Sequence, residues 1–188
     1  MVKSHDIQDY LRKHFANYVY ELHHTYVFGW ESDFFAVAKQ TDYVIEVEIK
    51  VSRSDFKADF QKTTFHENIN KHSYLQDKTK KYKPNKFAFA CPDGLIKPDE
   101  IPPEYGLFYL EETKYESPQI HYSNYFRCVR GPKFLHKENL FQDRYFVLKL
   151  LDKFYWRNND LQYAMGLLSS DIRFGQRRIN SDEYKERY

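Results

Sequence analysis

One stretch, YVIEVEIKVSRSDFKAD at residues 43–59, restricts the fold of this chain more than any other, because it begins with charged residues alternating with apolar ones. A β-strand turns successive side chains to opposite faces. The side chains that can enter a core from one face are Tyr43, Ile45, Val47, Ile49 and Val51. The side chains that project together from the other face are Glu46, Glu48 and Lys50. The pattern therefore predicts a strand with one apolar face and one charged face.

A second strand is predicted just before the first, in the run WESDFFAVAK at residues 30–39. The polar residues 40–42 would join the two strands as a β-hairpin. With a connection of two or four residues, opposed positions have numbers that add to an odd total, so Asp33 would lie opposite Glu48 or Lys50. The Cβ atoms of such a pair are about 5 Å apart, which suits two carboxylates that share one hard cation. A loop of odd length or a bulge would instead turn Asp33 to the other face.

Helices are expected in three further parts of the chain. The first runs from near the N-terminus to about Tyr18. The sequence Ser-Arg-Ser-Asp at residues 52–55 is a capping pattern that begins a second helix. Between residues 132 and 166 the apolar residues keep a helical period, which predicts a long amphipathic helix, and a shorter helix can follow from Leu161.

Short apolar or aromatic runs predict the remaining strands. They lie at residues 26–30, at 86–91 (KFAFAC) and at 106–110 (GLFYL), with a less legible strand or hairpin at 119–129. The predicted fold class is therefore α/β (α+β), with the order α-β-β-β-α-β followed by C-terminal helices.

The length and composition of the chain favour one folded domain with an appendage. The chain has 188 residues, of which 41% are hydrophobic and 19% aromatic, so a sizeable core can form. We expect a core domain at residues 1–130, a helical extension packed on it at 131–170, and a polar tail at 171–188. With no apolar window as long as a membrane span, no signal-peptide pattern and two cysteines, the sequence favours a cytoplasmic protein without a membrane partner.

The net charge of +2 neither demands nor excludes a nucleic-acid partner. Its distribution is more informative, because residues 50–86 carry many lysines interleaved with aromatic residues. We expect phosphate contacts from four cations in this region: Arg53, Lys57, Lys62 and Lys71. A solvated helix face explains the same charges equally well.

The element order, an acid on the second strand and Glu-x-Lys on the third resemble the PD-(D/E)XK nuclease superfamily over roughly residues 6–110. Within it, the run IEVEIKVSRSDFKADF at residues 45–60 is similar to MmcB-like DNA-repair proteins and related phage or prophage proteins. The resemblance implies a restriction-endonuclease-like core with a mixed central sheet. It also implies a phosphodiesterase that uses Mg²⁺ or Mn²⁺.

By position, the resemblance makes Asp33 and Glu48 metal ligands and Lys50 the residue that orients or deprotonates the attacking water. Ser32 is a departure, because it stands where the superfamily's name has proline. Glu46 is a candidate additional ligand. A further acid commonly comes from the first helix, and Asp9 is our choice there.

Two functions from different classes remain open at this point. The first is a metal-dependent nuclease, expected to be a DNA endonuclease, in DNA repair, recombination or phage DNA processing within a bacterial or phage-infected cytoplasm. The second is a non-catalytic module that binds DNA or a protein, with the long C-terminal helix as a surface for a partner or a homodimer. Glu-x-Glu-x-Lys alone is more often a solvated strand face than a catalytic site.

Overall fold

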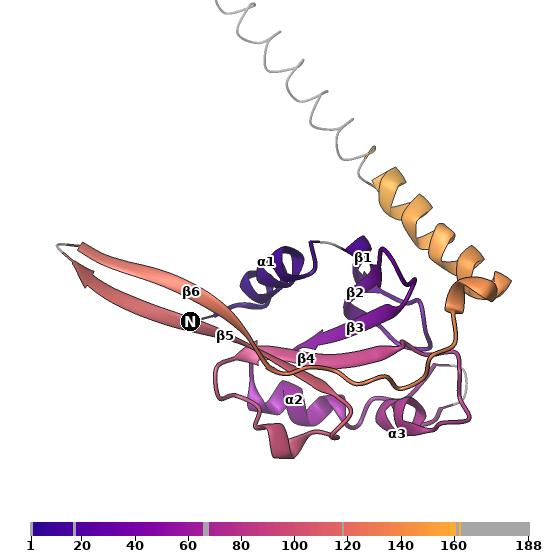
Figure 1. Ribbon diagram of the computed structural model, residues 1–188, viewed down its shortest axis with the longest axis horizontal. Coiled ribbons are helices and arrows are strands. Elements are labelled where there is room, and N and C mark those ends of the chain that lie inside the picture. The colour runs from indigo at the N-terminus through magenta and orange to yellow at the C-terminus, as the bar shows by residue number, and fades with distance from the viewer. Residues whose placement is uncertain (1, 17, 66–67, 118, 161, 163–188) are drawn as a thin grey trace, which may run out of the picture. The chain divides into compact units, whose positions relative to one another are not determined.

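The computed structural model describes residues 2–16, 18–65, 68–117, 119–160 and 162 (Figure 1). The chain divides into two compact units, residues 1–146 and 147–188. Within the described residues of the first unit, six strands form one mixed sheet in the order β1-β2-β3-β4-β5-β6. The elements are α1 (Ser4–His14), β1 (Tyr18–Thr25), β2 (Ser32–Ala38), β3 (Val44–Ile49), α2 (Arg53–Asp59), α3 (Lys71–Gln76), β4 (Lys86–Pro92), η1 (Pro98–Glu100), β5 (Gly106–Ser117), β6 (Gln119–Arg130) and η2 (Leu140–Gln142).

The sheet combines an antiparallel half with two parallel pairings. Strands β1, β2 and β3 form an antiparallel meander. The helices α2 and α3 then connect β3 to its parallel neighbour β4, and a second crossover brings β5 parallel to β4. Strand β6 returns antiparallel to β5. The predicted α+β class with a mixed central sheet is confirmed.

Helix α1 covers one face of this sheet, and α2 and α3 cover the other (Figure 1). The apolar stripe of α1, which includes Ile7 and Leu11, packs in one core cluster with Ile45, Val47 and Ile49 of β3. The alternation predicted for these three residues is therefore confirmed. Val51 is a correction, because β3 ends at Ile49 and the Val51 side chain is 41% exposed.

The charged face of β3 is buried as well. All six residues of β3 are buried, because α2 and α3 lie over the side chains that point away from α1. Helix α2 begins where its capping pattern predicts, since Ser52 Oγ accepts a hydrogen bond of 3.2 Å from the Asp55 amide. Helix α3 is capped in the same way by Asn70, whose side chain accepts from the Ser73 amide.

The strand predicted at residues 26–30 is wrong. This segment is the turn between β1 and β2, and the first strand lies earlier, at Tyr18–Thr25. Helix α1 correspondingly ends at His14, before the predicted Tyr18. Phe28 and Trp30 are nonetheless buried, with ring centroids 5.7 Å apart. Here the aromatic run indicates residues that pack in the core, and a turn can bury aromatic rings as well as a strand can.

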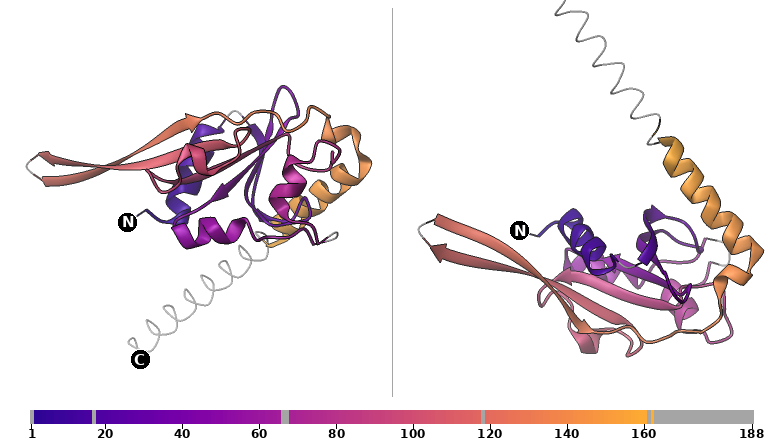
Figure 2. Two further views of the ribbon diagram at one scale, coloured as in Figure 1. Left: turned by 90° about the horizontal axis from the view of Figure 1, so that it is seen from below. Right: turned by 45° about the horizontal axis from the view of Figure 1, so that its top comes forward.

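The predicted strands at 86–91, 106–110 and 119–129 are present as β4, β5 and β6, and the last two are longer than the sequence suggested. Strand β4 pairs with β5 only as far as Leu110, while β6 follows β5 to its end at Ser117. Beyond Leu110 the hairpin therefore leaves the sheet as a two-stranded arm, as the views in Figures 1 and 2 agree.

A helix spans residues 144–160, and it confirms the predicted long C-terminal helix over that range. Asp143 Oδ1 accepts from the amides of Tyr145 and Phe146 at its start. The shorter helix predicted from Leu161 and the tail predicted at 171–188 lie outside the described residues, apart from residue 162. No helix in the described parts of the chain is long and apolar enough to cross a membrane.

The cap of α2 gives a direct test of this local structure. Replacing Ser52 by Ala should lower the free energy of unfolding by about 1 kcal/mol, because the Asp55 amide loses its acceptor. Urea denaturation followed by circular dichroism measures the change. Lys57→Ala is the matched control and should change stability by less than about 0.5 kcal/mol, since it alters an exposed side chain inside the same helix. Equal effects of the two substitutions would contradict the assigned cap.

Candidate active site

The register of β2 against β3 brings the predicted acids together. Phe34 pairs with Val47 and Phe35 with Glu46, so opposed numbers add to an odd total. A 2.8 Å hydrogen bond from the Ala38 amide to the Tyr43 carbonyl closes the connection, and four residues, 39–42, lie between this pair. Carried one residue further, this register places Asp33 opposite Glu48, as the sequence predicted.

Asp33 lies on the exposed side of the site. Its Oδ2 accepts a 2.8 Å hydrogen bond from the Ile49 amide and lies 3.9 Å from Lys50 Nζ. The side chain is 22% exposed, whereas those of Glu48 and Asp59 are fully buried. Burial and, after it, the negative charge of Glu48 raise the pKa of Asp33 to about 6. Two carboxylates thus face each other with the outer one open to solvent.

Glu48 is the centre of the charge network. Its Oε2 lies 2.9 Å from Lys50 Nζ and 3.3 Å from Lys62 Nζ. Its Oε1 lies 2.5 Å from Lys71 Nζ. Burial favours the neutral acid, but the positive charges of the lysines, led by Lys71, outweigh it and lower the pKa of Glu48 to about 2. Glu48 is therefore a carboxylate with both oxygens occupied by cations.

Asp59, an acid that the sequence analysis did not select, reaches the same site from α2. Its Oδ1 lies 2.9 Å from both Lys50 Nζ and Lys62 Nζ. Its Oδ2 lies 2.8 Å from His72 Nε2. Although burial opposes ionisation, the hydrogen bond from His72 and the neighbouring lysines hold the pKa of Asp59 below its usual range. We refer to Asp33, Glu46, Glu48, Asp59, Lys50, Lys62 and Lys71 as the acid–lysine cluster.

Behind Asp59, His72 and Tyr105 extend the network into the core. Burial, opposed by the hydrogen bond to Asp59, lowers the pKa of His72 from its ordinary value, which favours the neutral ring at pH 7. Its Nε2 is best assigned as the N–H that donates to Asp59, because a carboxylate can only accept. Nδ1 is then the acceptor for the Tyr105 hydroxyl, at 3.1 Å. The pair fixes the orientation of Asp59 and thereby of Lys50.

Lys50 carries its positive charge in this arrangement. Burial favours the neutral amine, but the negative charges of Glu48 and Asp59 raise the pKa of Lys50 above its ordinary value. Its Nζ lies 2.9 Å from an oxygen of each of these acids. Lys50 is therefore suited to donate hydrogen bonds to a phosphate or a water, and in this state it is not a free base.

Glu46 and Lys71 form the inner part of the cluster. Lys71 Nζ lies 3.1 Å from Glu46 Oε1, and the Trp30 indole N–H donates to the same oxygen at 2.7 Å. Glu46 Oε2 is buried and has no hydrogen-bond partner among the described residues. Burial, against the opposing charge of Lys71, raises the pKa of Glu46 to about 7.

Asp9 does not join the site, which corrects its assignment as a metal ligand. Helix α1 packs on the face of the sheet opposite to Glu46 and Glu48. The Asp9 side chain is 60% exposed and lies 3.5 Å from Arg12 of the same helix. The apolar stripe of α1 determines which way the helix faces, and Asp9 lies outside that stripe.

The predicted phosphate contacts have three different environments. Lys57 is exposed on α2, and Lys62 is 41% exposed and pairs with Glu48 and Asp59. The Arg53 guanidinium donates to Glu100 and to the Leu95 carbonyl, so it already has partners. Lys71 as a surface phosphate contact is wrong, because its side chain is completely buried between Glu46 and Glu48.

Sequence periodicity contained a signal for Asp59. Phe56 and Phe60 stack edge to face on the buried side of α2, and Asp59 lies one turn after Phe56. An acid beside the apolar face of a short helix, directly after a strand that carries two acids, is a candidate for burial. His72, Tyr105 and Trp30 carried no comparable signal, because their positions depend on how distant segments pack.

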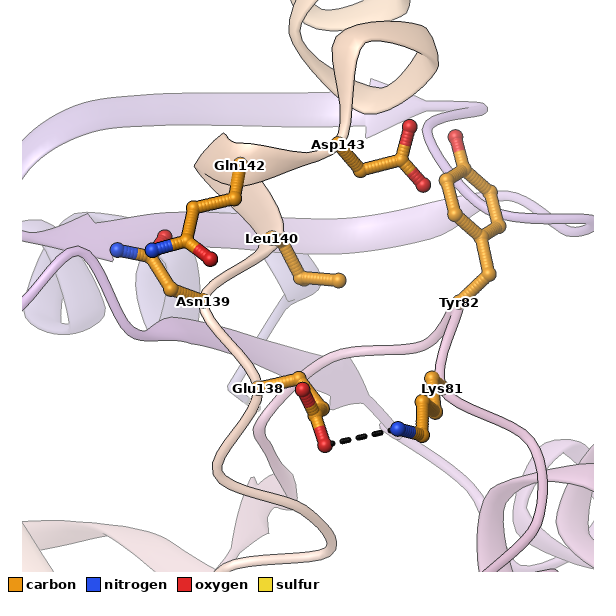
Figure 3. Close-up of a pocket in the computed structure, with 7 residues that line it drawn as sticks. All are labelled: Lys81, Tyr82, Glu138, Asn139, Leu140, Gln142 and Asp143. Carbon is orange, nitrogen blue, oxygen red and sulfur yellow. Dashed lines mark hydrogen bonds and ion pairs between the residues drawn. The ribbon is translucent and has the colours of Figure 1, made fainter.

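An open pocket of about 420 Å³ lies elsewhere, between residues 81–82 and the segment 138–143 (Figure 3). Lys81 and Glu138 form a 3.0 Å ion pair at its edge. No member of the acid–lysine cluster lines it. The pocket therefore has no part in the candidate chemistry of β2 and β3.

Comparison with protein-family models, with curated proteins and with solved structures found no match for this chain. Across the described parts of the chain, no three His, Cys, Asp or Glu side chains are grouped in a way that could hold a metal ion. Among the described residues, a cation at this site would have fewer than three such side chains as ligands, with other oxygens completing its coordination.

The raised pKa of Glu46 predicts a pH dependence of stability. Between the ordinary pKa of 4.5 and the folded-state pKa of about 7, the folded protein binds more protons at Glu46 than the unfolded chain does. The contribution of Glu46 to stability therefore falls as pH rises through this window. In metal-free buffer, Glu46→Gln should flatten the decline in unfolding free energy from pH 4.5 to 7, measured by urea denaturation.

Glu104→Gln is the matched control for this experiment, because it removes an exposed carboxyl. It should keep the wild-type dependence on pH. An unchanged slope in Glu46→Gln would show that Glu46 titrates near its ordinary pKa in the folded protein.

Proposed function

We propose that this chain is a metal-dependent nuclease of the PD-(D/E)XK type, which hydrolyses DNA phosphodiester bonds with Mg²⁺ or Mn²⁺. The observation that carries the proposal is the meeting of Asp33, Glu48 and Lys50, with Lys50 Nζ 2.9 Å from Glu48 and 3.9 Å from Asp33. An acid on β2 that meets, in the expected register, an acid on β3 and the lysine directly after β3 is stronger support than a Glu-x-Lys motif alone.

The outer side of the cluster fits a small hard cation. After burial, the negative charge of Glu48 is the next cause of the raised pKa of Asp33, and a divalent ion between the two carboxylates would offset their repulsion. Mg²⁺ commonly uses one or two protein carboxylates and keeps several waters. The 41% exposure of Lys62 leaves its flexible side chain room to move away from Glu48 when an ion arrives.

A bound ion would polarise a phosphoryl oxygen and lower the pKa of a coordinated water. The chain's own residues would complete the chemistry. Lys50 presents a charged ammonium that can donate to a non-bridging phosphate oxygen or to the attacking water. Asp59, held by His72, keeps that ammonium in place. Lys62 and the exposed Lys57 are then the cations best placed to meet the DNA backbone.

A second function has one observation in its favour. Lys50, Lys62 and Lys71 already compensate the buried carboxylates, so the cluster is electrostatically satisfied without a metal. Such a network can be purely structural. In that case the chain is a non-catalytic module that binds DNA or a protein.

Cleavage of plasmid DNA separates the two functions. With Mn²⁺ or Mg²⁺, the wild-type protein should nick supercoiled plasmid, and Asp33→Asn should lower the rate by about 100-fold or more, because a ligand carboxylate is lost. Lys50→Met should have a similar effect on rate. Gel electrophoresis of the products measures both, with circular dichroism as a check on folding.

Asp9→Asn is the matched control, since this exposed aspartate lies on α1 against the opposite face of the sheet. It should retain wild-type cleavage. The outcome that favours the binding module is a wild type that binds DNA but does not cleave plasmid, branched or single-stranded DNA with any divalent metal. Asp33→Asn should then bind DNA as well as the wild type does.

A further inference from the structure

We propose that the Lys71 ammonium takes the place of a second divalent ion in the inner half of the acid–lysine cluster. The site then accepts one divalent ion and excludes a second. The inference rests on the proposed metal-dependent function and specifies how many ions that function uses. It concerns the position between Glu46 and Glu48, the two acids that neighbour each other on the charged face of β3.

Lys71 occupies the place that a second ion would need. Its Nζ bridges Glu46 Oε1 at 3.1 Å and Glu48 Oε1 at 2.5 Å. Two carboxylates from alternate residues of one strand are a natural pair of ligands for a divalent ion. In this chain an ammonium makes both contacts.

The surroundings of Lys71 Nζ suit an ammonium, and while the Lys71 side chain fills them they leave no room for a hydrated ion. The side chain is fully buried, and the rings of Phe87 and Trp30 lie 5.0 and 5.5 Å from Nζ. Aromatic faces attract an ammonium, but they supply no oxygen to a metal. Mg²⁺ usually retains several waters, and the buried Lys71 side chain occupies the space that such waters would need.

The backbone holds Lys71 in position. Lys71 is the first residue of α3, after the Asn70 cap, and its amide donates to the Lys62 carbonyl at 2.8 Å. The Asn70 side chain also donates to the Phe60 carbonyl. The two segments that meet here therefore fix the start of α3 and the direction of the Lys71 side chain.

The two carboxylate oxygens of Glu48 therefore have different lysine partners. Its Oε1 is taken by the buried Lys71, whereas its Oε2 is shared by Lys50 and the partly exposed Lys62. Asp33 lies on the outer side, near Lys50. The outer position can accept an ion from solvent, and the inner position is already filled.

Isothermal titration calorimetry with MnCl₂ on the full-length protein tests the proposal directly. The wild type should bind one Mn²⁺ per chain, and Asp33→Asn should lose that binding. Two ions per wild-type chain, with Asp33→Asn still binding one, would overturn the role of Lys71 and leave the proposed nuclease intact. No Mn²⁺ binding by the wild type would overturn both.

Lys71→Ala gives a second readout that does not depend on activity. Removing the ammonium takes the cation away from Glu46 Oε1 and Glu48 Oε1, so the Tm without metal should fall by roughly 10 °C. Mn²⁺ should then raise the Tm of Lys71→Ala by about 5 °C more than it raises that of the wild type, because the vacated inner position can take an ion. Equal Mn²⁺ shifts in the two proteins would contradict the proposal.

Lys83→Ala is the matched control. Lys83 is 1% exposed, but its Nζ donates to the backbone carbonyls of Leu75 and Asp77 at 2.7 and 2.6 Å. Its loss should also lower the Tm, without creating a site for a cation. A Mn²⁺ shift in Lys83→Ala as large as that in Lys71→Ala would mean that the metal stabilises any weakened variant, which would overturn the assignment.

Discussion

The burial of ionised carboxylates under α2 and α3 is the constraint on which the rest of this structure depends. Glu48 and Asp59 are fully buried, and an isolated buried charge would cost several kcal/mol. The segment between β3 and β4 must therefore place lysines as well as apolar side chains against the sheet. Lys62 and Lys71 meet this need at either end of the segment that joins α2 to α3.

The same network sets the chemical character of the site. Glu48 and Asp59 hold Lys50 in its charged form, so the lysine acts as a donor. Among the acids of the acid–lysine cluster, Asp33 is the one that reaches solvent. Asp33 consequently differs from Glu48 and Asp59 in both exposure and pKa. Whether the cluster is catalytic or structural is decided at Asp33, since the inner residues are compensated in either case.

Particular residues show where sequence reasoning succeeded and where it failed. The register of Asp33 against Glu48 was predictable because strand pairing and a four-residue connection leave few alternatives. The Ser52 cap was predictable because its hydrogen bond is local. Residues 26–30 were misassigned since burial of aromatic rings does not require a strand, and Asp9 was misassigned because the facing of α1 depends on its packing.

The sequence by itself determined the alternating strand, its partner acid on β2 and the start of α2, because these depend on period, register and hydrogen bonds between near neighbours. Only the tertiary structure decided that Asp59, His72 and Lys71 belong to the site and that Lys71 is buried. Their positions follow from how α2 and α3 dock on the sheet. That docking depends on many contacts between segments that are distant in sequence, and no local sequence pattern predicts those contacts.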